Sequence, residues 1–314
     1  MTIPRASSRR AVRRLLLAAG ALVAVVTLGT GGLVAAWLAG VRVPLASGQT
    51  ALTIQKVGNA EGATAPDQPF FVLLVGSDAR PGVGGARGDA LHVVGINPST
   101  RSATILNIPR DVCTRVPGAG YTKINSALSQ GGARGQADVV GALIGRPIPY
   151  VAALDFAGFV QVVDTIGGVT VDVPVAMDDR YSGAVFTAGR QRMNGGQALA
   201  FGRNRKQFAN GDITRTANQG VFLLGALQTL QAEARGAAGQ FRVASLLGRH
   251  AALEGVGLRE LWNMGRAAMR LDPARVRNVT MPVGYGGCAG GLVAGGGAES
   301  LFADFVDDAV LQAH

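Results

Sequence analysis

Residues 70–111 read FFVLLVGSDARPGVGGARGDALHVVGINPSTRSATILNIPRD, and this stretch predicts three short strands. The run 70–75 is wholly apolar, which is typical of a strand buried on both faces. Strands over 90–96 and 103–108 follow, joined by Asn-Pro turn chemistry. Charged residues stand at the strand ends: Asp78, Arg80, Asp89 and Arg110. In a chain with only 16% charged residues, this concentration predicts a site for a divalent metal and a phosphate.

The rest of the chain predicts strands and helices in alternation. Residues 116–132 predict a loop and then a short helix interrupted at Gly131-Gly132, and 136–145 predict a second short helix that ends at Gly145. Apolar periodicity indicates a helix over 156–168, and alternation indicates strands over 149–156 and 169–175. Residues 212–234 predict the strongest helix, with Asp212 as its N-cap and an apolar face at 221, 224, 227 and 230. Helices at 240–248, 257–270 and 298–312 and a strand at 276–283 complete the pattern. We therefore expect an α/β fold, with a mixed central β-sheet flanked by helices on both faces.

The first 69 residues predict a membrane topology. Residues 1–14 hold five arginines and no acid, and residues 15–40 carry no charge. About 20 apolar residues span a bilayer as a helix, and basic residues before the helix favour a cytoplasmic N-terminus. We expect a basic cytoplasmic tail (1–14), an uncleaved transmembrane signal-anchor (15–40), an extracytoplasmic stalk (41–69) and one domain over 70–314. A cleaved signal peptide is the alternative, although its apolar core is ordinarily shorter, about 7–15 residues.

This topology changes how the net charge and the cysteines are interpreted. The formal charge of +10 would ordinarily indicate nucleic acid, but half of the excess lies in the tail, so we expect no nucleic-acid partner. Outside the cytoplasm, the two cysteines, Cys113 and Cys288, favour a disulfide over the alternative of two reduced buried thiols.

Basic side chains in the second half of the chain complement the carboxylates of Asp78 and Asp89. Arg203 and Arg205 stand two apart and share one face only if the segment is extended. Arg215 and Gln219 stand four apart, on one face of the predicted helix. Arginine suits phosphate because its planar guanidinium makes paired, charge-assisted hydrogen bonds. His92, His250 and His314 stand apart from these motifs, and we assign them no chemistry.

Several motifs together resemble one family, the LytR-CpsA-Psr cell-envelope proteins. They occur in the family's order over about 70–220, and they read VGSDAR (75–80), GDAL (88–91), NIPRDV (107–112), KINSAL (123–128), DFAGFVQVVDTIGGVTVDVP (155–174), GQALAFGRNR (196–205) and GDITRTANQ (211–219). Val112-Cys113 departs from the Ser or Thr that frequently follows the PRD triplet in the family.

The resemblance implies a membrane-anchored phosphotransferase. It implies transfer of a glycopolymer from a polyprenyl pyrophosphate carrier to a muramic acid hydroxyl of peptidoglycan, through a phosphodiester. By position, Asp78 and Asp89 match carboxylates that bind Mg²⁺ or Mn²⁺. The matching pyrophosphate-binding residues are Arg110, Arg203, Arg205, Arg215 and Gln219, with Lys123 as a further candidate, and the four arginines are the expected catalytic groups.

Two other functions use the same residues. A pyrophosphatase acting on the same carrier would need the same arginines and would admit water as acceptor. A non-catalytic binder of anionic lipid or glycan would need no metal-dependent turnover. Product analysis with a muropeptide acceptor distinguishes the pyrophosphatase from the transferase.

Overall fold

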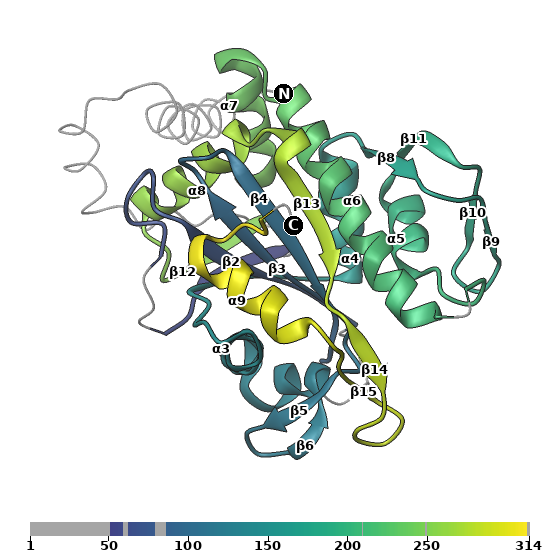
Figure 1. Ribbon diagram of the computed structural model, residues 1–314. Helices are drawn as coiled ribbons and strands as arrows, with labels where there is room; N and C mark the ends of the chain where they lie inside the picture. The colour runs from purple at the N-terminus through teal and green to yellow at the C-terminus, as the bar shows by residue number, and fades with distance from the viewer. Residues whose placement is uncertain (1–50, 59–61, 79–85, 209, 249, 313–314) are drawn as a thin grey trace, which may run out of the picture.

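The computed structural model describes residues 51–58, 62–78, 86–208, 210–248 and 250–312. A seven-stranded sheet forms its centre (Figure 1). Its strands are β1 (Leu52–Lys56), β2 (Phe70–Ser77), β3 (Gly88–Asn97), β4 (Ser102–Ile108), β7 (Tyr150–Asp155), β12 (Ala251–Glu254) and β13 (Val276–Thr280). They lie in the order β12-β1-β7-β2-β3-β4-β13.

The sheet is mixed, as the sequence predicts. β3 runs antiparallel to both of its neighbours, β2 and β4, with Val75 opposite Leu91 and Leu91 opposite Ile108. β2 pairs with β7, β4 with β13 and β1 with β12 in parallel. Because β3 begins where β4 ends, Asp89 and the segment after Ile108 meet at one edge of the sheet.

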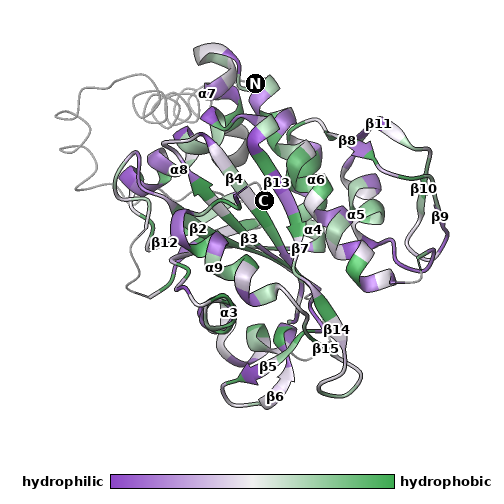
Figure 2. Cartoon of the chain, viewed as in Figure 1, coloured by the Kyte–Doolittle hydropathy of each residue, from purple (hydrophilic) through white to green (hydrophobic). Residues whose placement is uncertain are grey.

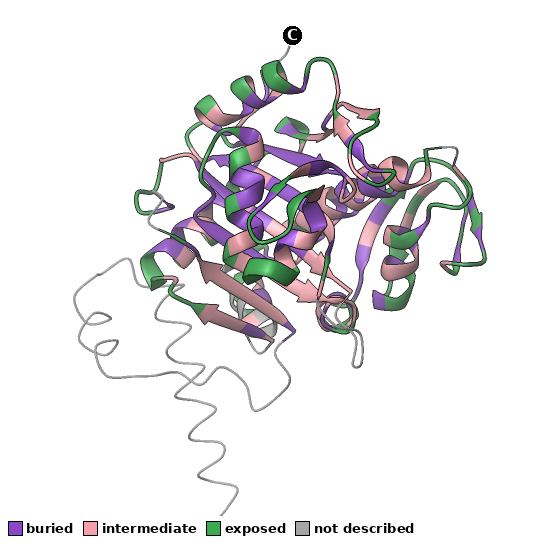
Figure 3. Cartoon of the chain, turned by 90° about the horizontal axis from the view of Figure 1, so that it is seen from below, coloured by how far each residue is buried: buried purple, intermediate pink, exposed green. Residues whose placement is uncertain are grey.

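Helices cover both faces of the sheet. The seven α-helices of the described chain are α3 (Ala127–Ile144), α4 (Phe156–Thr165), α5 (Gly195–Arg203), α6 (Gly211–Glu233), α7 (Gly236–Gly248), α8 (Leu258–Arg270) and α9 (Ala298–Asp308). Leu73, Val93 and Leu106 pack with α3 and α9 on one face. Ile96 and Ile105 pack with α6 and α8 on the other. Figure 3 shows buried residues gathered in the central strands, and Figure 2 shows hydrophobic residues along β2, β3 and β4.

A smaller unit, here called the side lobe, packs beside the sheet (Figure 1). It consists of α4, α5 and the strands β8 (Val169–Val173), β9 (Met177–Asp179), β10 (Ala184–Phe186) and β11 (Gly189–Met193). Its core holds Val171, Phe201 and Phe222, the last contributed by α6. Helix α6 therefore lies between two hydrophobic cores. Its buried positions differ for this reason from the single apolar face that we predicted: they are Arg215, Thr216, Asn218, Gly220, Phe222, Gly225 and Thr229.

Several predicted boundaries need correction. Residues 52–56 form β1 between β12 and β7, so the second half of the predicted stalk (41–69) belongs to the domain. Helix α6 begins at Gly211 with Asn210 at the N-cap position, so Asp212 is not the cap. Two short hairpins were not predicted: β5 (Cys113–Val116) with β6 (Gly120–Lys123), and β14 (Val283–Tyr285) with β15 (Leu292–Ala294).

The predicted transmembrane segment, residues 15–40, lies outside the described residues. Within the described part of the chain, the structure contains no helix with the length and apolar composition needed to cross a bilayer.

Candidate functional site

Asp89 and Arg110 form an ion pair at the edge of the sheet where β3 begins and β4 has ended. Nη1 of Arg110 donates to Oδ1 of Asp89 over 2.6 Å. The β2–β3 register passes from Gly76↔Ala90 to Ser77↔Gly88, so Asp89 is the extra residue of a β-bulge. A bulge turns a side chain out of the regular alternation of a strand. The bulge therefore frees Asp89 to face Arg110.

The first turn of α6 adds a second carboxylate and a second guanidinium. Nη2 of Arg215 lies 3.1 Å from Oδ1 of Asp212, and Nη2 of Arg110 lies 3.4 Å from the same oxygen. Arg215 also donates to the main-chain oxygen of Asp89 over 3.1 Å. Asp212 thus lies between two arginines that are 105 positions apart in sequence. We call Asp89, Arg110, Asp212 and Arg215 the arginine–aspartate cluster.

The cluster has an electrostatic character that suits an anion. Burial lowers the pKa of Arg215, the carboxylate of Asp212 raises it, and the nearby charge of Arg110 lowers it further. Burial also lowers the pKa of Arg110, but Asp212 and Asp89 together raise it above its ordinary value. The Nε atoms of both arginines are buried and have no hydrogen-bond acceptor among the described residues. Buried donors ordinarily have partners, so an added anion would satisfy the arginines and relieve their repulsion.

A buried polar network lies beneath the cluster. Nδ1 of His92, in β3, lies 2.7 Å from Oδ1 of Asn107, in β4, and Asn107 donates to Oδ1 of Asn278, in β13, over 2.7 Å. Gly220 of α6 packs directly on both asparagines, where an added Cβ would lie 2.0 Å from Oδ1 of Asn278. Only glycine permits this approach, which brings the helix carrying Arg215 against the sheet.

His92 itself is buried and neutral. Burial lowers its pKa to about 4, against opposing contributions from hydrogen bonds with Asn107 and Gln219. We assigned it no chemistry from the sequence, because a single histidine in an apolar strand carries no local signal. Its position under Arg215 makes it part of the framework of the site.

Of the remaining predicted residues, Asp78 and Gln219 are linked to the cluster through the strand and the helix that carry it. Asp78 directly follows β2, one residue after Ser77, which pairs with Gly88 beside Asp89. Gln219 lies one helical turn beyond Arg215 and donates to the main-chain oxygen of Gly202 over 2.9 Å. Arg80 lies outside the described residues.

Arg203 and Arg205 come from the end of α5. Arg203 is the last residue of the helix, and its guanidinium lies 5.4 Å from the ring centroid of Phe156. Asn204 is extended, but Arg203 belongs to the helix, so the segment 203–205 is only partly extended and the condition for joint use of both arginines is met only in part. The charge of Arg205 contributes to lowering the pKa of Arg215, so it lies close to the cluster. Both arginines are exposed.

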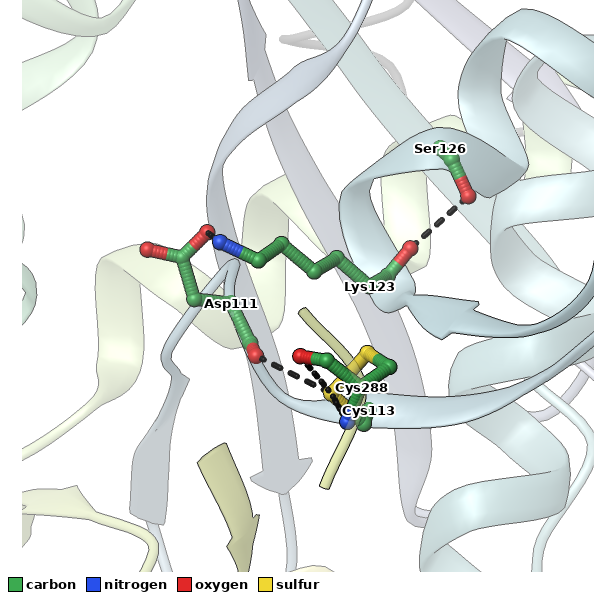
Figure 4. The surroundings of a disulfide bond; sticks show 5 residues. All are labelled: Asp111, Cys113, Lys123, Ser126 and Cys288. Atoms are coloured by element: carbon green, nitrogen blue, oxygen red, sulfur yellow. Dashed lines mark hydrogen bonds and ion pairs between the residues drawn. A yellow bond between two sulfur atoms is a disulfide. The ribbon is translucent and has the colours of Figure 1, made fainter. Parts of the chain in front are cut away.

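Lys123 and the cysteines adjoin the cluster on the side of β5. Nζ of Lys123 lies 3.0 Å from Oδ1 of Asp111, the residue after Arg110. Cys113 and Cys288 form the predicted disulfide, with their Cα atoms 5.8 Å apart (Figure 4). The bond ties the loop after β14 to the chain that carries Arg110.

A metal site can be assessed from the donor atoms present. Among the described residues there is no group of three or more histidine, cysteine, aspartate or glutamate side chains that could hold a metal. Two carboxylates at adjacent strand ends, Asp78 and Asp89, are nonetheless a donor set that Mg²⁺ uses when phosphate oxygens and water complete its coordination. The residues therefore fit Mg²⁺ bound together with a phosphate.

A family profile, curated sequences and solved structures all match this chain. The profile of the LytR_cpsA_psr family matches residues 45–294. The polyisoprenyl-teichoic acid–peptidoglycan teichoic acid transferase TagU of Bacillus subtilis (strain 168) is 33% identical over 216 residues, 68% of this chain and 70% of that protein. The protein of the same name from Bacillus licheniformis is 39% identical over 152 residues, 48% of this chain and 49% of its own length. The crystal structure of B. subtilis TagV superposes with a TM-score of 0.63 at 26% identity, over 75% of this chain and 94% of that one.

Proposed function

Because the chain belongs to the LytR_cpsA_psr family, we propose that it is a phosphotransferase that moves a glycopolymer from a polyprenyl pyrophosphate carrier onto peptidoglycan. The B. subtilis relative named above acts, by its name, on a polyisoprenyl-linked teichoic acid and peptidoglycan. The same classes of donor and acceptor are proposed for this chain.

The arginine–aspartate cluster is the observation that carries the proposal. Arg110 and Arg215 are held by Asp89 and Asp212, and the Nε atom of each arginine is buried without an acceptor. Fixed guanidiniums in a partly desolvated site stabilise negative charge without reorganising as it develops. A pyrophosphate that displaced part of the Asp212 contact would find two guanidiniums already aligned, and Arg205 and Gln219 lie near enough to add to them.

The reaction requires one bond to form and one to break. The acceptor hydroxyl oxygen bonds to the phosphorus that carries the glycopolymer, and the phosphoanhydride bond to the lipid phosphate breaks. Polyprenyl phosphate leaves with the electron pair, and the hydroxyl proton passes to solvent. Arg110 and Arg215 stabilise the charge that gathers on the phosphate oxygens as the anhydride opens.

We propose Asp78 and Asp89 as the holders of a Mg²⁺ or Mn²⁺ ion. When bound, such an ion would neutralise charge on the pyrophosphate. Asp89 would then serve two purposes, because its Oδ1 also orients Arg110.

The proposed location is the outer face of the cell membrane. Residues 1–14 supply the basic tail and 15–40 the uncharged apolar run on which this rests. A polyprenyl carrier stays in the membrane, so an anchored domain would meet its substrate at the surface. A reporter fused after His314 should be active only outside the cytoplasm.

The test is transfer of a radiolabelled lipid-linked glycan to peptidoglycan by the full chain in detergent, across a magnesium titration. Arg110→Ala and Arg215→Ala should each lower transfer about 10²–10³-fold. Arg134→Ala is the matched control, since Arg134 forms an exposed ion pair with Asp138. Transfer at the wild-type rate by a folded Arg110→Ala, Arg215→Ala double variant would contradict the proposal. Release of the glycan phosphate without attachment would identify a pyrophosphatase.

A further inference from the structure

A cavity of about 290 Å³ lies at the outer end of the side lobe, between the β9–β10 turn and the segment that follows α5. Its lining residues are Asp178, Asp179, Arg180, Tyr181, Lys206 and Gln207. Figure 1 shows β9 and β10 at the edge of the molecule, away from α3 and from the β5–β6 hairpin. None of these residues has a role in the transfer chemistry described above.

Hydrogen bonds join the two walls of the cavity. The buried carboxylate of Asp179 accepts the main-chain N–H groups of Arg205 and Lys206, each over 3.3 Å, and that of Tyr181 over 3.0 Å. Gln207 accepts the N–H of Asp178 over 3.0 Å and donates to the main-chain oxygen of Ala176 over 2.7 Å. The cavity is thus formed before any ligand arrives, which lowers the entropic cost of binding.

The side chains that face solvent here combine one aromatic ring with both signs of charge. Tyr181 is 86% exposed, although large aromatic side chains usually bury most of their surface. Nζ of Lys206 lies 5.3 Å from the centroid of its ring. Arg180 and Lys206 balance Asp178 and Asp179 in formal charge, so the cavity does not select an anion. A flat ring with neighbouring donors and acceptors suits a saccharide, whose C–H face packs on the ring while its hydroxyls form hydrogen bonds.

One wall of the cavity is connected to the start of α6, which carries part of the arginine–aspartate cluster. Asp179 holds the main chain of Arg205, and Arg205 packs on the start of α6. A Cβ added to Gly211 would lie 2.5 Å from the main-chain oxygen of Arg205. Gly211 immediately precedes Asp212 of the cluster. The segment that forms one wall of the cavity therefore also packs against the residue that precedes Asp212.

We propose that this cavity is a saccharide-binding subsite, with Tyr181 as the stacking platform and Asp178, Lys206 and Gln207 as the hydrogen-bonding groups. The inference rests on the proposed transfer function for its choice of ligand, since both the donor glycopolymer and peptidoglycan present sugars beside the reacting phosphate. The structure assigns the chemistry, and the experiment distinguishes the two sources.

The experiment measures saturation-transfer-difference NMR of the full chain in detergent with two probes, a soluble muropeptide and an oligosaccharide of the donor glycopolymer. Tyr181→Ala should reduce the signal of one probe at least fivefold and raise the KM of the matching substrate about tenfold, while Tyr181→Trp retains both. Tyr121→Ala is the matched control, because Tyr121 is also exposed (59%) but lies on β6. If Tyr181→Ala loses the signal of the muropeptide, peptidoglycan is the ligand. If it loses the signal of the oligosaccharide, the glycopolymer is the ligand.

Unchanged signals and KM values in a folded Tyr181→Ala variant would overturn the inference. If the protein transfers no glycopolymer but one saccharide signal still depends on Tyr181, the transfer function fails and the subsite stands. Circular dichroism and the melting temperature of each variant establish that it is folded.

Discussion

Replacement of Asp212 by asparagine tests the arginine–aspartate cluster most directly. The side chain keeps its size but loses the charge that Arg110 and Arg215 share at 3.4 Å and 3.1 Å. Two guanidiniums then face each other with only Asp89 between them. Folding should become less favourable, and binding of an anion should become more favourable. The variant therefore separates a structural ion pair from an anion site, because only an anion site predicts the second effect.

The size of the first effect follows from burial. Removing one partner of a buried ion pair costs about 3–5 kcal/mol in the free energy of unfolding. The side chains of Arg215, Asp212 and Arg110 retain 8%, 19% and 19% of their exposure, so water offsets part of this cost. We expect a loss of roughly 2–3 kcal/mol. For a domain of this size, that loss lowers the melting temperature by roughly 5–10 °C.

The assay is thermal unfolding of the full chain in detergent, with and without inorganic pyrophosphate. Ligand at about 100 times its Kd adds about 2.7 kcal/mol to the stability of the folded state. Pyrophosphate should raise the melting temperature of Asp212→Asn more than that of wild type, because the variant has no carboxylate at position 212 to compete with pyrophosphate for Arg110 and Arg215. Asp138→Asn is the control, because Asp138 forms an exposed ion pair with Arg134. Its melting temperatures with and without pyrophosphate should equal those of wild type. A variant that melts at the wild-type temperature, or that gains less from pyrophosphate, would refute the reasoning.

Three further predictions use other parts of the site. Arg110→Lys should recover only part of the transfer lost in Arg110→Ala, because an ammonium lacks the planar pair of donors. Equal transfer rates for wild type and Arg110→Lys would exclude bidentate binding of the phosphate by Arg110. Stability should fall as pH drops from about 6.5 toward 4, by roughly 1.4 kcal/mol per unit, because unfolded His92 takes up a proton that the folded state excludes. His92→Gln should flatten this slope in urea titrations, and an unchanged slope would assign it to other groups. Reduction of Cys113–Cys288 should lower stability by up to about 5 kcal/mol, since the bond closes a separation of 175 residues, and unreduced protein should resist thiol reagents; ready labelling would show that the bridge is absent.

Local signals predicted the parts of the fold that depend on neighbouring residues. The apolar runs predicted β2, β3 and β4, and the Asn-Pro turn predicted the reversal between β3 and β4, which brings Asp89 to the segment that carries Arg110. Gly132 has a positive φ of 62° at the kink of α3, and Gly145 ends the same helix with φ of 78°. Both glycines appear in the sequence as interruptions of an otherwise helical pattern.

Long-range pairing accounts for what was missed. β1 mixes polar and apolar residues, and it becomes an inner strand only because β12, about 200 positions later, covers its outer edge. Asp212 has the residue type of an N-cap, but Arg110, on another element, engages its carboxylate instead. Nothing near His92 in sequence indicates Asn107, which contacts it from β4, or Asn278 in β13, which accepts a hydrogen bond from Asn107. The spacing of Asp212 and Arg215, three apart on a helix, was the one local signal for the missing carboxylate.

The inner position of β1 has a mechanical consequence. β1 is the first strand of the described chain, and it is hydrogen-bonded to β12 on one side and β7 on the other. Inter-strand hydrogen bonds run across the axis of a strand, so a pull along the strand loads them together in shear instead of opening them one at a time. A domain held through β1 resists extraction by tension better than one joined through an edge strand. Shortening β1 would therefore weaken the protein under load before it altered its chemistry.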